Sequence, residues 1–550
     1  MAHGGPSLRK DVTPFRRVLV ANRGEIAVRI IRACHEAGLE AVAVYSDADA
    51  TARHVRMADR AVRLGPAPPA ESYLRIEAIV AAAIETGAGA IHPGYGFLAE
   101  RAAFARAVED AGLVFVGPSS AAIDALGDKL HARRIAREVG VAVVPGTLEP
   151  APVERAEDVD RILADAAEVG YPLLVKAAAG GGGRGMRRVT RPADLPAALA
   201  AGSHEAAAAF GDGSVYLERE IAPARHIEVQ MLGDSEGHVV AIGERDCSIQ
   251  PRHQKLVEEA PAPGLAEDER RALHAMAVRV AAAAGLRNAA TAEFLRAPDG
   301  QCYFLEVNTR LQVEHGITEL VSGLDIVREQ LALAAGEPLS EAALAAADRA
   351  ATPSAHAIEV RLTAEDPSLD FAPTPGRVRR WTMPAGPGVR VDAAIEAGER
   401  IPPDYDNLIA KIMVVGHDRA TAIARLRRAL DETEIAGIQT TLPFHRFVAR
   451  SAAFATGDLS IGWIGEHWDG PAARARAVKV GQLAAGIDAL GDGVTTAARA
   501  PTPRTDGATG DQAATDRNGH RPGASIASDA RDDSAWAEAG RQAATDRWPR

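Results

Sequence analysis

The sequence predicts a multidomain α/β protein, and two stretches carry most of that prediction. Near the start, an apolar strand at residues 17–21 precedes a helical pattern of apolar side chains at 26–33 and a second strand at 40–45. This is the βαβ opening of a doubly wound parallel sheet. Further on, an apolar run at 302–305 continues into residues 306–315, which alternate between polar and apolar side chains. That alternation predicts an extended segment with one polar face.

The bulk composition limits the possible classes of protein. A chain of 550 residues is too long for one core, and about three domains are expected. The net charge of −12 disfavours general nucleic-acid binding. Cys34, Cys247 and Cys302 show neither metal-binding nor disulfide spacing, which favours a reducing compartment. Residues 1–17 lack the apolar core of a signal peptide, and no apolar run reaches membrane-spanning length, so we expect a cytoplasmic protein without a membrane partner.

Two loops of the first domain follow predicted strands. Residues 22–25 contain one glycine where the dinucleotide fingerprint has three, so NAD binding is not predicted. Residues 92–97 read His-Pro-Gly-Tyr-Gly-Phe, and we expect a ligand loop there with Tyr95 exposed. The alternative is a tight turn whose glycines serve only the backbone. A strand at 114–118 closes the domain.

A glycine run follows the strand at residues 171–176, which ends in Lys176. Residues 180–185 hold five glycines in six positions, a composition that exposes backbone N–H groups to a polyphosphate. The spacing is not that of a Walker A motif. A flexible linker would also be glycine-rich, but the run lies between two strand-like segments, 171–176 and 186–189. This placement favours a hairpin lid over phosphates.

Strands are also predicted at 215–221 and 225–230. Residues 244–255 are dense in hydrogen-bond donors; a solvated basic loop is the alternative to a binding segment. Glu293 lies on a strand that a turn at 298–300 connects to the segment that begins at residue 302. Because adjacent strands lie about 4.8 Å apart, Glu293 and the acids of that segment can share cations.

One face of the extended segment at 306–315 is selective in its chemistry. The residues on it are Glu306, Asn308, Arg310, Gln312 and Glu314. A carboxylate and an amide oxygen suit Mg²⁺, which prefers oxygen ligands. The arginine and the second carboxylate suit an anionic substrate and a base. An ordinary amphipathic strand would explain the alternation, but not this choice of residues.

The C-terminal part opens with an alternating strand at 356–362, which places Glu359 and Arg361 on one face. An amphipathic helix is predicted at 419–430. After residue 468 the apolar periodicity ends and the hexapeptide Gln-Ala-Ala-Thr-Asp-Arg occurs twice, so we expect a disordered tail.

Together these stretches resemble the biotin carboxylases of the ATP-grasp superfamily, over residues 17–468. The pieces that carry the resemblance are residues 18–27, His-Pro-Gly-Tyr-Gly-Phe at 92–97, the glycine run at 180–186, Arg-His-Gln-Lys at 252–255 and Glu-Val-Asn-Thr-Arg-Leu-Gln-Val-Glu-His at 306–315. The resemblance implies an N-terminal extension (1–16), a Rossmann-like pre-ATP-grasp domain (17–127), an ATP-grasp domain (128–350) with a mobile lid at about 148–220, an α+β C-terminal domain (351–468) and a low-complexity tail (469–550).

By the same resemblance the protein carboxylates biotin with bicarbonate and ATP, and each site residue has an implied role. The residues implied to bind phosphates or ribose are Lys129, Lys176, His253, Gly181, Gly182, Gly183 and Gly185. Those implied to contact the adenine are Glu218 and Ile221. The implied ligands of Mg²⁺ or Mn²⁺ are Glu293, Glu306 and Asn308. Bicarbonate is implied to bind to Lys255, Arg310, Gln312 and Val313, and Glu314 is implied to accept its proton. Arg361 stabilises the biotin enolate, and Tyr95, His226 and Gln250 lie near biotin or nucleotide.

The chain departs from the family pattern at Gly316, Pro251 and Ala179, where the family has proline, arginine and glycine. No Ala-Met-Lys-Met occurs, so biotin is expected on a separate carrier protein. The expected partners are that carrier, a carboxyltransferase subunit of an acetyl- or acyl-CoA carboxylase, and a second copy of the chain. Two alternatives stay open: an ATP-grasp enzyme that joins a carboxylate to an amine through an acyl phosphate, and a non-catalytic homologue that regulates a carboxylase complex.

Overall fold

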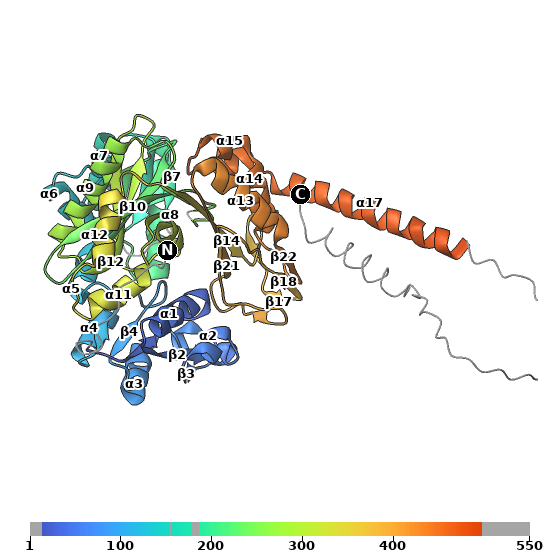
Figure 1. Cartoon of the computed structure of the whole chain (residues 1–550). Coiled ribbons are helices and arrows are strands. Elements are labelled where there is room, and N and C mark those ends of the chain that lie inside the picture. The colour runs from blue at the N-terminus through green and yellow to red at the C-terminus, as the bar shows by residue number, and fades with distance from the viewer. Residues whose placement is uncertain (1–13, 154–155, 179–185, 253, 498–550) are drawn as a thin grey trace, which may run out of the picture. The chain divides into compact units, whose positions relative to one another are not determined.

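The computed structural model describes residues 14–153, 156–178, 186–252 and 254–497 (Figure 1). The described residues up to Trp468 form one compact unit, and Asp469 begins a second. Within the described ranges, no helix has the length and apolar character needed to cross a bilayer.

The first part of the compact unit is a five-stranded parallel sheet, as the βαβ pattern predicted. Its strands are β1 (Arg17–Val20), β2 (Glu40–Ser46), β3 (Arg60–Gly65), β4 (Ala90–His92) and β5 (Val114–Phe115), in the order β3-β2-β1-β4-β5. Its helices are α1 (Gly24–Glu36), α2 (Arg53–Met57), α3 (Ile76–Thr86), α4 (Ala102–Asp110) and the short η1 (Asp47–Asp49) and η2 (Pro69–Glu71). The strand order reverses between β1 and β4. There Asn22 Nδ2 donates to Pro93 O at 2.7 Å and Tyr95 O at 2.8 Å, which joins the two loops.

The glycine run connects two strands of a small antiparallel sheet. The sheet has the order β7-β6-β8 and consists of β6 (Leu173–Ala177), β7 (Arg187–Val189) and β8 (Val215–Arg219), with α7 (Ala156–Val169), η3 (Pro192–Asp194) and α8 (Leu195–Phe210) beside it. β6 and β7 pair antiparallel, as predicted for a hairpin. The glycines between them lie outside the described residues.

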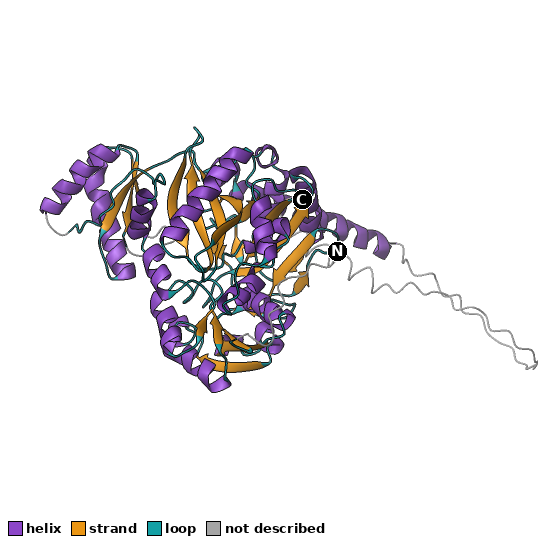
Figure 2. Ribbon diagram, turned by 60° about the vertical axis from the view of Figure 1, so that its left-hand side comes forward, coloured by secondary structure: helices purple, strands orange, loops and turns teal. Residues whose placement is uncertain are grey.

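The largest sheet crosses the predicted boundary at residue 350. In spatial order its strands are β13 (Cys302–Asn308), β12 (Asn288–Arg296), β9 (Arg225–Gly233), β10 (Val239–Ile249), β11 (Val257–Ala260), β14 (His356–Thr363), β21 (Leu408–Gly416) and β19 (Val389–Ala393). Figure 2 shows these strands side by side with helices packed over them. β11 pairs with β14, so the second and third predicted domains share one continuous sheet. Residues from both can therefore converge on one site.

The remaining elements of the compact unit are helices and short strands, and the short strands pair as β15-β16, β17-β20 and β18-β22. The helices are α5 (Ser120–Gly127), α6 (Lys129–Glu138), α9 (Glu267–Ala283), α10 (His315–Ser322), α11 (Ile326–Ala334), α12 (Glu341–Arg349), α13 (Arg419–Glu432), α14 (Leu442–Arg450), α15 (Ala452–Thr456) and α16 (Trp463–His467). The short strands are β15 (Glu365–Asp366), β16 (Ala372–Pro373), β17 (Gly376–Arg377), β18 (Arg380–Thr382), β20 (Arg400–Ile401) and β22 (Glu434–Ala436).

The prediction that residues 306–315 form one extended segment is wrong beyond Asn308. β13 ends there, and α10 begins at His315. Arg310 stabilises the turn between them, because its guanidinium donates back to Asn308 Oδ1 at 3.1 Å and forward to Gln312 Oε1 at 2.9 Å. The polar side chains therefore come together through a folded turn and not through strand alternation.

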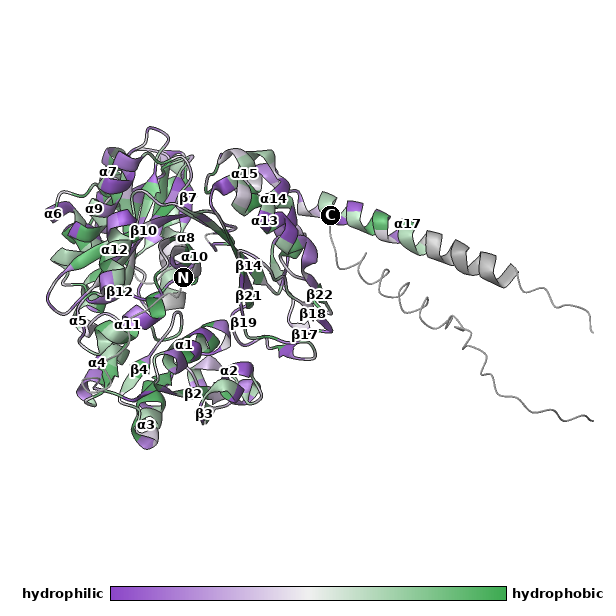
Figure 3. Ribbon diagram, in the orientation of Figure 1, coloured by the Kyte–Doolittle hydropathy of each residue, from purple (hydrophilic) through white to green (hydrophobic). Residues whose placement is uncertain are grey.

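The prediction of a disordered tail is wrong for its first part, because α17 spans Gly470–Ala497. Asp469 accepts the N–H of Ala472 at 2.9 Å, and the alanines that follow have the highest helix propensity of any residue. Figure 3 shows hydrophilic and apolar residues mixed along the first turns, and Val478, Val480 and Leu483 are 50%, 60% and 68% exposed. A helix without an apolar stripe gives no periodic signal, which is why the sequence pattern missed it. The rest of the predicted tail lies outside the described residues.

Candidate active site

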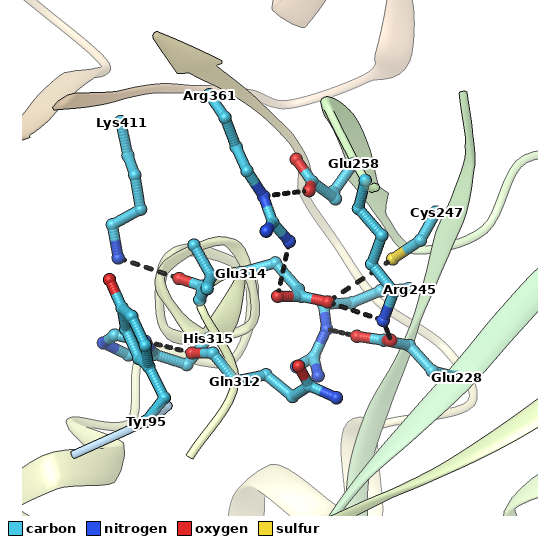
Figure 4. A network of polar contacts seen from close by, with 12 residues as sticks. Tyr95, Glu228, Arg245, Cys247, Glu258, Gln312, Glu314, His315, Arg361 and Lys411 are labelled. Atoms are coloured by element: carbon cyan, nitrogen blue, oxygen red, sulfur yellow. Dashed lines mark hydrogen bonds and ion pairs between the residues drawn. The ribbon is translucent and has the colours of Figure 1, made fainter. Parts of the chain in front are cut away.

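Glu314 lies between two cations at the start of α10, in the centre of the site. Its Oε1 accepts from Lys255 Nζ at 2.9 Å. Its Oε2 accepts from Arg361 Nη2 at 2.9 Å (Figure 4). Lys255 precedes β11, and Arg361 belongs to the neighbouring strand β14. Glu314 is fully buried. Both oxygens of this carboxylate are therefore fixed, one by the segment that precedes β11 and the other by β14.

The charges around Glu314 keep it ionised. Burial by itself raises the pKa of a carboxyl group, but the attraction of Lys255, Arg361 and Arg245 holds the pKa of Glu314 well below its ordinary value. The group is therefore available to accept a proton. While both cations stay on it, however, it is a weak base, since a general base works best with a pKa near the working pH.

Lys255 connects the acid at position 314 to two other carboxylates. Its ammonium contacts Glu228 and lies 2.8 Å from Glu293 Oε1. Burial lowers the pKa of Lys255, but the three glutamates outweigh burial and raise it well above the ordinary value. Lys255 therefore carries a permanent positive charge at the middle of an acidic cluster, where it can also attract an anion.

The predicted metal ligands are adjacent, and their chemistry fits Mg²⁺. Glu293 and Glu306 face each other across the β12–β13 pair, and Asn308 Nδ2 donates to Glu293 Oε1 at 2.9 Å. Lys129 Nζ lies 2.9 Å from Glu306 Oε2, and the pKa of Glu293 is lowered: burial raises it, but Lys255 and His226 lower it further. Two carboxylates beside an amide oxygen are a suitable oxygen donor set for a hard divalent cation.

The predicted anion-binding residues also converge. Besides its bonds to Gln312 and Asn308, Arg310 donates through Nε to Glu100 at 2.9 Å. Gln312 Nε2 reaches Glu293 Oε1 at 3.3 Å. The side chain of Arg310 therefore contacts the candidate metal ligand Asn308. Burial lowers the pKa of Arg310, but the charges of Glu100, Glu314 and Glu293 are close enough to outweigh burial and raise it.

Among the residues predicted to contact the nucleotide, Glu218 is a second buried carboxylate between two cations. It accepts from Arg133 of α6 and from Lys176 of β6. Ile221 follows β8 and is half-buried, and Gln250 is buried just after β10. Gly181, Gly182, Gly183, Gly185 and His253 lie outside the described residues.

Two predicted site residues have surroundings that the sequence did not indicate. His226 Nε2 lies 3.2 Å from Glu293 Oε2, and burial, which lowers the pKa of His226, is outweighed by Glu293, so the pKa is raised. His226 is therefore next to the candidate metal ligands. Tyr95, expected to be exposed, is half-buried, and its hydroxyl donates to Glu25 of α1. The reason is that the loop at 92–97 folds onto α1 through Asn22.

Sequence reasoning missed several buried groups of the site. Arg245 contacts Glu228 and donates to Thr318 Oγ1 at 2.8 Å, and Arg361 Nε donates to Glu258 Oε1 at 2.6 Å. A usable signal was present for one of them: Glu228 is two residues from His226 and therefore on the same face of β9. Charged residues inside predicted buried strands need partners and so point to a site.

Comparisons with known proteins agree with this geometry. Family models match in chain order: "Biotin carboxylase, N-terminal domain" at residues 14–123, "Carbamoyl-phosphate synthase L chain, ATP binding domain" at 128–342 and "Biotin carboxylase C-terminal domain" at 359–466. The biotin carboxylase of Pseudomonas aeruginosa is 48% identical over 450 residues, which is 82% of this chain and 98% of the relative. Biotin carboxylase 1 of Bacillus subtilis is 46% identical over 447 residues, which is 81% of this chain and 97% of the relative.

Solved structures give the same result. The biotin carboxylase domain dimer of the Hydrogenobacter thermophilus 2-oxoglutarate carboxylase, in complex with MgADP, ADP and bicarbonate, superposes with a TM-score of 0.78 at 43% identity, covering 82% of this chain and 98% of that one. A biotin carboxylase–ATP complex from Campylobacter jejuni gives a TM-score of 0.78 at 43% identity, covering 82% and 99%.

The three-part architecture and its ATP-binding domain define an ATP-grasp ligase. Within that class the chain belongs to the biotin carboxylase family: it is an ATP-dependent ligase that forms a C–N bond on biotin.

Proposed function

We propose that this chain carboxylates the biotin of a separate carrier protein, as the first half-reaction of an acetyl- or acyl-CoA carboxylase. The observation that carries the proposal is the buried Glu314 between Lys255 and Arg361. Bicarbonate is a poor nucleophile until it loses its proton, so an ionised carboxylate must touch it. Glu314 would accept that proton, while Lys255, Arg310, Gln312 and Val313 would hold the anion.

The release of Glu314 from its cations is part of this proposal. When Lys255 turns to bicarbonate and Arg361 to the ureido oxygen of biotin, Glu314 loses the contacts that depress its pKa and becomes a stronger base. Arg361 would then stabilise the negative charge that makes the ureido nitrogen nucleophilic. Substrate binding would thus switch on the base.

On the nucleotide side we assign Lys129, Lys176 and His253 to phosphates or ribose, the glycines at 181–183 and 185 to phosphates, and Glu218 and Ile221 to the adenine. Glu293, Glu306 and Asn308 would hold Mg²⁺, which supplies neutralisation of phosphate charge when bound. The support for this assignment is the adjacency of the three ligands to Lys129 and Arg310.

The test is ATP hydrolysis by the purified full-length chain. We expect ADP release that requires bicarbonate and that free biotin accelerates. A carboxylate–amine ligase of the same superfamily would hydrolyse ATP without either dependence, and a non-catalytic homologue would not hydrolyse it at all. Arg361→Met should remove the acceleration by biotin and leave ATP binding intact.

We also propose which acyl group is finally carboxylated and which proteins bind this chain. The support for an acyl-CoA complex is the 47% identity to the biotin-dependent acyl-coenzyme A carboxylase alpha3 subunit of Mycobacterium leprae, over 82% of this chain and 75% of that protein. A homodimer is supported by the dimer of the Hydrogenobacter domain. Affinity capture of the tagged chain should recover a biotinylated carrier together with an acyl-CoA transferase. Recovery of a pyruvate-specific transferase instead would reassign the acceptor.

A further inference from the structure

A row of three charged residues crosses the strands next to Glu314. Arg361 of β14 pairs directly with Lys411 of β21, and Lys411 pairs with Asp392 of β19. Directly paired residues project from the same face of a sheet. Since Arg361 contacts Glu314, the whole row faces the turn that carries the base (Figure 4).

Lys411 holds the residue before the base. Its Nζ donates to the carbonyl oxygen of Val313 at 2.8 Å. It also lies 3.1 Å from Glu25 Oε1 of α1 and 3.9 Å from Asp392 Oδ2, and its side chain is fully buried. One ammonium therefore connects α1, the C-terminal strands and the peptide between Val313 and Glu314.

The ammonium stays charged in this position. Burial lowers the pKa of Lys411, but Glu25, Glu359 and Asp392 outweigh burial and raise it above the ordinary value. Packing alone does not require a lysine here, because the flanking strand residues are apolar and a methionine would fill a similar volume without a desolvation cost. The specific feature that a lysine adds is the bond to the Val313 carbonyl.

We propose that Lys411 is a positioning residue for bicarbonate activation. By fixing the Val313 carbonyl it sets the orientation of the next peptide unit, and with it the direction in which Glu314 enters the site. The proposal rests on the proposed roles of Val313 and Glu314. It assigns to Lys411 no contact with substrate.

The test compares Lys411→Met with the wild-type full-length chain, in bicarbonate-dependent ATP hydrolysis with free biotin. We expect kcat/KM for bicarbonate to fall by about 10- to 100-fold, the range expected when a reacting group is misplaced by about 1 Å. The KM for ATP should stay within about twofold, because the bonds of Lys411 run to Val313, Glu25 and Asp392 and not to the nucleotide side. A purely structural role would not separate the two substrates.

A second variant separates the effect on bicarbonate kinetics from the loss of the Lys411–Glu25 ion pair. Lys411→Met leaves Glu25 buried without its cation, whereas Lys411→Met combined with Glu25→Gln removes both charges. We expect the double variant to regain folding stability and to keep the bicarbonate defect. If it folds and has wild-type kcat/KM for bicarbonate, the proposal is overturned.

Arg446→Met is the matched control. Arg446 is also buried, lies in the same C-terminal part, and donates to backbone carbonyls, those of Leu430 and Thr433, at 2.8 Å and 3.0 Å. This variant should lose stability and keep the wild-type KM for bicarbonate; an equal bicarbonate defect in it would also overturn the proposal. A wild-type chain whose ATP hydrolysis ignores bicarbonate would instead refute the proposed function, and this inference with it.

Discussion

Two buried carboxylates, Glu218 and Glu314, have the same arrangement of charges and serve different parts of the site. Each accepts from one lysine and one arginine, and in each the cations outweigh burial and lower the pKa. The arginines and lysines that contact these two carboxylates differ in the other hydrogen bonds that they make. Arg133 of α6, which contacts Glu218 of β8, also donates to the backbone carbonyl of Val144.

Around Glu314 the second contacts are with other charged side chains, not with the backbone. Lys255 reaches Glu228 and Glu293, and Arg361 reaches Glu258. In the proposed function these contacts are exchanged for substrate, whereas the bond from Arg133 to the backbone stabilises the fold. The comparison suggests that Glu218 organises a binding surface and Glu314 takes part in chemistry.

The sharpest test of that difference is Glu314→Gln, for which we expect the largest effect. The amide keeps the shape and cannot accept the proton of bicarbonate, so biotin carboxylation should fall by about 10²- to 10⁴-fold. ATP should still bind, with a dissociation constant within about twofold of wild type in a calorimetric titration. Carboxylation near the wild-type rate would refute the assignment of the base.

Glu218→Gln should give the opposite pattern. The substitution leaves Arg133 and Lys176 without their carboxylate on the nucleotide side, so we expect the KM for ATP to rise about 10-fold or more while the KM for bicarbonate is unchanged. Steady-state kinetics with each substrate varied in turn measures both. If the KM for ATP and the KM for bicarbonate both rose, Glu218 and Glu314 would act on the same binding step.

The sequence predicted some features of the fold and of the candidate site and missed others. The strands and the hairpins were predictable because apolar runs and turn residues mark them, and the resemblance supplied the order of the site. The turn after Asn308 was not predictable from alternation, because side-chain bonds of Arg310 stabilise it. Lys411 was missed although it is a lone lysine in the apolar strand β21, a pattern that indicates a buried charge with a partner.

Gly316 shows how a departure from the family pattern is accommodated next to the base. A Cβ atom on Gly316 would lie 2.3 Å from Sδ of the fully buried Met413. Gly316→Ala should therefore cost about 1–3 kcal/mol of unfolding free energy, and in the double variant with Met413→Ala the two losses should sum to less than their separate values. Urea denaturation measures the coupling.

Gly465→Ala is the control for that cycle. Gly465 also lies in a helix, α16, and among the described residues nothing is within 4 Å of the position of its Cβ. This substitution should be neutral or slightly stabilising, since alanine is the better helix former. Equal losses at both glycines would contradict the packing argument.

Glu258 and Glu314 share Arg361, yet they titrate differently. Burial raises the pKa of Glu258 to about 7 against the attraction of Arg361, and Glu314 adds to the rise. The unfolded chain has the ordinary glutamate value of 4.5, so the native state binds more protons between these two values. The stability that protonated Glu258 contributes is present below pH 4.5 and is lost as the pH rises through about 7. Urea midpoints measured from pH 4.5 to 8 should show a decline from this group that is absent in Glu258→Gln.

The smallest effect is expected for deletion of residues 475–550, which removes most of α17. The residues up to Trp468 form a compact unit of their own, and all described site residues belong to it. Val478, Val480 and Leu483 of α17 are at least half exposed, at 50%, 60% and 68%. The shortened chain should carboxylate free biotin within about twofold of the full-length rate, a change that corresponds to about 0.4 kcal/mol in the barrier. A much lower rate of carboxylation would show that α17 supports the site.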